Sequence, residues 1–152
     1  MLANFGSAVV LSLAALGVYG CGAAAEEPVL ARFFAAARLR DHTALARLST
    51  VVFEPQVDGI VAQFAVTNVT SERPAAPVPD VVQLSIGDPQ IPRDRRDAAG
   101  VTSKDVTIDA QLRLFDGRSV QKTLIVTLQR AILKGDRATL GRWIVTAIRV
   151  AN

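Results

Sequence analysis

The chain has 152 residues, half of them hydrophobic, and a formal net charge of +3 at pH 7. Its single cysteine excludes an intramolecular disulfide, and the length suits one domain. The densest basic cluster, Arg93, Arg95 and Arg96, is interrupted by Asp94 and Asp97. The sequence therefore lacks the one-signed basic surface of a nucleic-acid-binding protein.

The residues before Glu26 carry no charge and run into the lone cysteine. An apolar core from Val9 to Val18, with the small Gly20 before Cys21, is typical of a secretory signal. The run Val18–Cys21 resembles the lipobox of bacterial lipoproteins. That resemblance implies that Cys21 becomes a lipidated N-terminus.

We therefore expect a signal peptide over residues 1–20, a short tether over 21–27 and a single exported α+β domain over 28–152. Membrane attachment through the lipid places the domain in the bacterial cell envelope, facing the periplasm or the cell surface. Two alternatives stay open. The uncharged stretch exceeds the approximately 18 residues of a spanning helix, so it is also compatible with an uncleaved anchor, or with a simple cleaved signal.

Two helices are predicted at the start of the domain. Acidic residues and Pro28 suit a first turn, and apolar residues recur at helical spacing until about Arg40. Asp41 is a suitable cap for a shorter helix that buries Leu45 and Leu48. The sequence thus predicts an N-terminal helical hairpin.

Strands are predicted from Val51 onward, where alternation replaces the helical period, and the first of them covers residues 60–67. The clearest alternation covers residues 106–114 and precedes a hairpin turn at Asp116–Gly117. Two further strands, 120–133 and 140–150, complete an antiparallel meander. In the first strand the inward residues are expected to be Ile60, Ala62, Phe64 and Val66.

Between these parts, residues 73–103 are proline-rich and are predicted to form a loop, with only Val81–Ile86 resembling a strand. A loop of this length is uncommon in a compact domain and is either functional or disordered. The prolines deny hydrogen-bond donors to a sheet. A central strand is therefore not expected here.

The helix Val29–Ala37, the segment Asp41–Leu48 and strands that end in Arg142–Val145 together resemble the nuclear transport factor 2-like (NTF2-like, SnoaL-like, cystatin-like) superfamily. The resemblance implies a curved antiparallel sheet wrapped around the helices as a cone, often with a pocket at its open end. The third helix usual in that superfamily has no predicted counterpart, because the proline-rich segment occupies its place. The superfamily includes enzymes, ligand-binding proteins and assembly modules, so the fold does not select a function.

Few side chains suggest catalysis. His42 falls at the start of the second helix, and alternation places Asp109 on the exposed face of its strand. No spacing of Cys, His or acidic residues suits a metal ion, and we expect no cofactor. One set of apolar residues could line a ligand pocket, although core packing explains the same residues: Phe33, Phe64, Leu112, Val126 and Ile144.

The leading hypothesis is a non-enzymatic envelope lipoprotein that binds a protein partner or a small apolar ligand at the membrane surface. One alternative is a small isomerase or dehydratase of the same fold, which needs an acid or base inside the cone. Another is a purely structural assembly module, for which a homo-oligomer is the expected state.

Overall fold

The computed structural model describes residues 25–51, 53, 59–77, 79–88, 98–134 and 139–151. The expectations for residues 1–24, including cleavage and the lipidation of Cys21, lie outside the described residues. The helices are α1 (Glu27–Leu39), α2 (His42–Leu48) and α4 (Pro79–Ile86), and the strands are β1 (Ile60–Val69), β2 (Arg73–Ala75), β3 (Ala98–Arg113), β4 (Ser119–Leu133), β5 (Thr139–Leu140) and β6 (Ile144–Val150).

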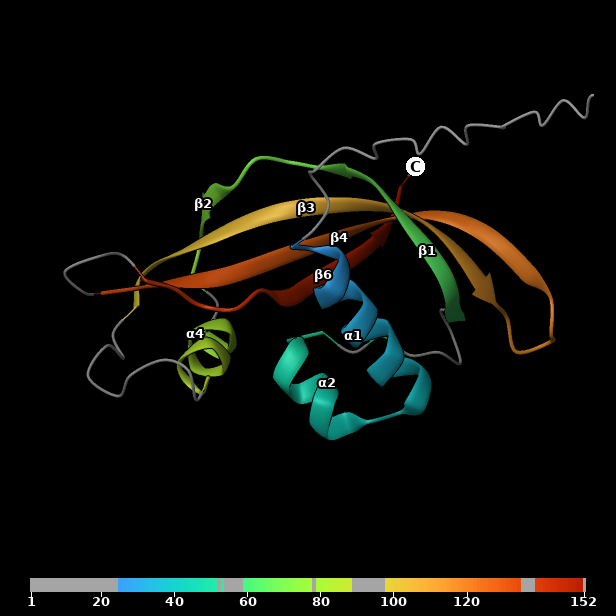
Figure 1. Ribbon diagram of the computed structural model, residues 1–152, viewed down its shortest axis with the longest axis horizontal. Helices are drawn as coiled ribbons and strands as arrows, with labels where there is room; N and C mark the ends of the chain where they lie inside the picture. The colour runs from blue at the N-terminus through green and yellow to red at the C-terminus, as the bar shows by residue number, and fades with distance from the viewer. Residues whose placement is uncertain are drawn as a thin grey trace, which may run out of the picture.

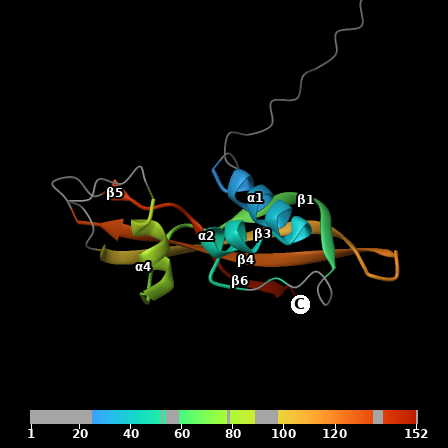
Figure 2. The same ribbon diagram turned by 90° about the horizontal axis from the view of Figure 1, so that it is seen from below.

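These strands form one six-stranded antiparallel sheet in the order β1-β3-β4-β5, with β2 added to β3 and β6 added to β4. The sheet is open and curved, and the long β3–β4 hairpin runs along its whole length (Figure 1). Figures 1 and 2 show the helices on one side of the sheet, with α4 near the β2 end. The predicted α+β class and helical hairpin are therefore confirmed.

The two N-terminal helices form for the reasons that the sequence suggests. Glu27 and a proline occupy the first turn of α1, and the Asp41 carboxylate accepts a hydrogen bond from the backbone N–H of Ala44 at 2.9 Å. Arg40 closes α1 in a left-handed conformation with φ of 54°, where glycine is usual. None of the helices that the structure describes combines the length and hydropathy that a bilayer crossing needs.

The predicted inward face of β1 is wrong at its first two positions. The pairing of β1 with β3 shifts between Val61 and Gln63 and again between Val66 and Asn68. Each irregularity reverses the side that later residues face, because side chains alternate along a strand. Val61 is therefore buried, whereas Ala62 is exposed.

The prediction of a strand at Val81–Ile86 is also wrong, because these residues belong to α4. Pro79 and Asp80 suit a first helical turn, and the fully buried residues Val81 and Ser85 are one helical turn apart. The predicted loop over residues 73–103 is wrong for much of its described part, where β2, α4 and the beginning of β3 supply regular structure. Residues 101–103 of β3 even lie centrally, between β2 and β4, because the prolines of this range fall outside β3.

The main core lies between α1 and the sheet. It contains Phe33, Phe34 and Phe53, and the inward residues of β3 and β4 pack against these rings. A smaller cluster under α4 joins Val81, Val101 and Ile144. A Cβ atom at Gly141 would lie 2.9 Å from Cβ of Ser85, so α4 approaches the chain after β5 very closely.

Candidate functional site

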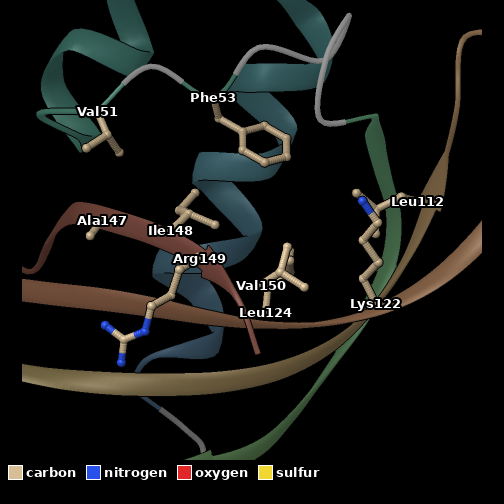
Figure 3. A pocket seen from close by; sticks show the side chains of 9 residues that line it. All are labelled: Val51, Phe53, Leu112, Lys122, Leu124, Ala147, Ile148, Arg149 and Val150. Carbon is tan, nitrogen blue, oxygen red and sulfur yellow. The ribbon is translucent and has the colours of Figure 1, made fainter. Parts of the chain in front are cut away.

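A groove of about 390 Å³ lies between the segment that follows α2 and the β4–β6 side of the sheet. Figure 3 shows its side chains: Val51, Phe53, Leu112, Lys122, Leu124, Ala147, Ile148, Arg149 and Val150. Most of them are apolar. The groove is therefore suited to the hydrocarbon part of a ligand.

The wall of the groove is held in place by the aromatic core. The ring centroid of Phe53 lies 5.7 Å from that of Phe34 and 6.2 Å from that of Phe33, in edge-on arrangements. The end of α2 is joined to β6 by a bridge between Ser49 and Val145. The groove is thus built on fixed elements on both sides.

Two cations border the groove, and among the described residues only one of them has an ion-pair partner. The Arg149 guanidinium lies 3.6 Å from the Asp105 carboxylate, and Figure 3 shows it directed away from Phe53. The Lys122 side chain extends along the other border. Within the described part of the chain Lys122 has no ion pair, so its ammonium group is available to an anionic ligand.

A buried ion pair and two cation–π contacts lie beside the start of α1. The Lys104 ammonium group pairs with the Glu26 carboxylate, and both side chains are less than one-tenth exposed. The Lys104 Nζ atom lies 4.2 Å from the centroid of the Trp143 ring, and the Arg130 Cζ atom lies 4.3 Å from it. We call these four residues, together with Glu72, the charged cluster.

Glu72 completes the charged cluster. Its carboxylate accepts a hydrogen bond from Arg130 at 2.6 Å, and this bond holds the pKa of Glu72 below its ordinary value. Nearby, burial raises the pKa of Asp105, but hydrogen bonds from Thr127 and Arg73 and the charge of Arg149 outweigh it. The net effect is a lowered pKa for Asp105.

The charged cluster is better suited to holding the fold together than to chemistry. Each carboxylate already faces a cation, and the paired cations lie against a ring. None of the cluster residues lines the groove. The ion pair of Glu26 with Lys104 ties the start of α1 to the middle of the sheet.

The structure brings together most, but not all, of the residues predicted to line a pocket. Phe33, Leu112 and Val126 are buried in the main core, and Phe64 packs against it half-buried. Ile144 belongs to the smaller cluster under α4. Only Leu112 of these five borders the groove.

The residues considered for catalysis lie away from the groove. His42 is exposed at the start of α2, and Asp109 is exposed and accepts a hydrogen bond from the Thr123 hydroxyl at 2.7 Å. The expected exposed position of Asp109 is confirmed. Within the residues that the structure describes, no group of three or more His, Cys, Asp or Glu side chains is placed to hold a metal ion.

Sequence reasoning missed both Lys122 and Lys104, although the strand pattern contained a signal for each. Lys104 continues the inward alternation of Val106 and Ile108, and Lys122 precedes the inward residues Leu124 and Val126. A lysine at an inward-facing position of a strand indicates either a buried ion-pair partner or a binding site. Phe53 was missed because the alternation from Val51 onward predicted strand there, and this prediction is wrong: Val51 and Phe53 lie outside the strands.

Comparisons of the chain with protein-family models, with curated proteins and with solved structures return no match. The proposed function therefore rests on the groove and the residues that border it.

Proposed function

We propose that this chain is an exported, lipid-anchored envelope protein whose domain binds an amphipathic anion without chemical conversion. The observation that carries the proposal is an apolar groove bordered by Lys122, a cation with no ion pair among the described residues. The hydrocarbon part of the ligand fills the groove, and its acidic head group pairs with the ammonium group.

The NTF2-like cone is part of this proposal. Its support is the arrangement of α1 and α2 on one side of a curved sheet (Figure 1). The groove lies where the segment after α2 meets β6 (Figure 3). In such a cone the groove is the open end. Ligands therefore enter without unfolding the core around Phe33.

The anchor is proposed from the sequence around Cys21. Glu26 is buried and starts the folded domain, so the chain between it and Cys21 spans at most about 17 Å at about 3.4 Å per residue. A lipid on Cys21 would therefore hold the domain close to the membrane surface. Intact-mass analysis of membrane-extracted protein, compared with Cys21→Ser, tests this: we expect loss of residues 1–20 and a lipid mass that the variant lacks.

An unmodified full-length mass would contradict the anchor and leave the groove proposal standing, because the groove is tested separately. The probe is 11-(dansylamino)undecanoic acid, titrated into the chain from residue 22 onward after circular dichroism has shown that it folds. We expect saturable binding with enhanced dansyl emission. The corresponding alcohol should bind about fivefold more weakly, because it lacks the charge that pairs with Lys122.

Two variants locate the binding. Lys122→Glu should weaken the acid about tenfold, which corresponds to about 1.4 kcal/mol, and should leave the alcohol unchanged. Lys134→Glu is the matched control, because Lys134 is also exposed but lies just beyond the other end of β4. Equal loss in both variants would mean that the protein attracts the probe by net charge alone, and the groove would not be its site.

A further inference from the structure

A second cavity, outside the groove, lies where the C-terminus of α1 meets the turn of the β3–β4 hairpin. Its volume is about 260 Å³, and Arg38, Arg40 and Arg113 contribute to its lining. Leu114 and Phe115, from the hairpin, lie on the same cavity. We call this feature the hairpin-tip pocket.

Among the described residues, every charged side chain on the hairpin-tip pocket is basic. The described lining contains no carboxylate, and its three arginines make no ion pair within the same part of the chain. Among the described residues, the acidic groups next to the lining in the chain are already engaged: Asp116 pairs with Arg118 at 2.6 Å, and Asp41 caps α2. Guanidinium groups without a carboxylate partner favour an anion with several oxygen atoms.

Phe115 lines the hairpin-tip pocket, and Leu39 lies between Arg38 and Arg40 in the chain. Phe115 is 80% exposed and Leu39 is 73% exposed, which makes them the most exposed large hydrophobic residues of the described structure. Phe115 lies in the narrow turn, where a Cβ atom on Gly117 would meet nothing within 4 Å. An aromatic ring in this exposed turn can enter an apolar environment outside the protein without any rearrangement of the fold.

The backbone of Arg40 sets the direction of its side chain. It adopts φ of 54° at the end of α1, where its N–H donates to the carbonyl oxygens of Ala36 and Ala37 and closes the helix. Here it places the Arg40 side chain on the hairpin-tip pocket.

We propose that the hairpin-tip pocket docks on a bilayer that contains anionic phospholipid. The arginines bind lipid phosphates, while Phe115 and Leu39 enter the boundary between head groups and acyl chains. A soluble phosphate would satisfy the arginines but would leave both apolar side chains in water, and the combination of the two favours a membrane surface. The proposal does not depend on the lipid anchor or on the groove.

The test uses the full chain with Cys21→Ser, so that a cysteine introduced by Phe115→Cys is the only one and can carry the dye NBD. Vesicles of phosphatidylcholine are compared with vesicles in which 30% of the lipid is phosphatidylglycerol. Because the apolar N-terminal segment is the same in all variants, we measure the environment of the label rather than binding. We expect about threefold brighter, blue-shifted emission on the anionic vesicles and little change on the neutral ones.

A label introduced by Leu140→Cys is the matched control, because Leu140 is 46% exposed and lies at the opposite end of the sheet. It should not distinguish the two vesicles. The double change Arg38→Gln and Arg113→Gln should reduce the response at position 115 at least twofold, and 0.5 M salt should do the same by screening. Equal responses at positions 115 and 140, or an undiminished response after the arginine changes, would overturn the proposal. So would the full response with inorganic phosphate alone.

Discussion

The two halves of the β3–β4 hairpin are stabilised in different ways. In the turn half, residues 106–113 and 119–126, the inward side chains are almost all apolar and face α1. In the open half, residues 98–105 and 127–133, the inward positions include Lys104 and Arg130. Along its length, the inward face of this strand pair thus changes from almost entirely apolar to apolar with charged side chains among its members.

The two halves also differ in how completely their buried polar atoms are paired. Within the described residues, the buried polar side-chain atoms without a hydrogen-bond partner lie in the open half or in the elements packed on it: Ser85 Oγ, Gln129 Oε1, Arg130 Nε and Arg142 Nε. An unsatisfied buried polar atom costs about 1–3 kcal/mol. The open half should therefore unfold locally before the turn half does.

The largest effect is expected from breaking the charged cluster. Glu26→Ala leaves the Lys104 ammonium group buried without its carboxylate and should lower the free energy of unfolding by about 3–5 kcal/mol. Urea unfolding measures the loss. Glu27→Ala is the matched control, because Glu27 is exposed one position further along the chain.

Adding Lys104→Met to Glu26→Ala should recover much of that loss, because no unpaired charge then remains in the open half. If the double variant is as unstable as Glu26→Ala alone, packing around Glu26 and not the ion pair stabilises this region.

A smaller effect is expected where α4 meets the sheet. In Gly141→Ala the new Cβ atom would lie 2.9 Å from Cβ of Ser85 and 3.2 Å from the carbonyl oxygen of Ala131, so overpacking should cost about 1–3 kcal/mol. Gly100→Ala, in the same half, meets nothing within 4 Å and should gain about 0.5 kcal/mol. Thermal unfolding that ranks the two variants in the opposite order would mean that α4 is not tightly packed.

The smallest expected effect is a dependence of the free energy of unfolding on pH, caused by two carboxyl groups beside the open half. Glu72 and Asp105 have lowered pKa values in the folded protein. Their contribution to stability is present above the ordinary carboxyl pKa and is lost as the pH falls through the lowered values, so unfolding should become easier below about pH 4.

Urea unfolding between pH 7 and pH 3 checks this expectation. Glu72→Gln should make the decline shallower. Ile108→Val, in the turn half, should instead cost about 0.5–1.5 kcal/mol at every pH, because it removes only an apolar contact. A decline that Glu72→Gln does not change would assign the acid sensitivity to other carboxyl groups.

The turn half was largely predictable from the sequence. Alternation from Val106 to Leu112 and the turn at Gly117, which has φ of 84°, specify the hairpin locally. The Asp41 cap likewise depends on a contact only three residues along the chain. In these cases the residues that determine the structure are close to the residues that adopt it.

The rest was not predictable because it depends on distant partners. Val82, Leu84 and Ile86 alternate as in a strand, yet α4 buries Val81 and Ser85 against the sheet. Lys104 finds Glu26 at a separation of 78 residues. The candidate groove has the same origin, since Phe53 and Lys122 meet only after the sheet has formed.

Trp143 is an intrinsic fluorescent probe of the charged cluster. It is the only tryptophan in the chain, and its ring lies against two cations of the charged cluster. Because indole emission responds to nearby charge and to water, the emission of Trp143 reports on the charged cluster and on the edge of the main core that the ring joins. Its change during unfolding should precede the loss of far-ultraviolet circular dichroism, which averages over the whole sheet.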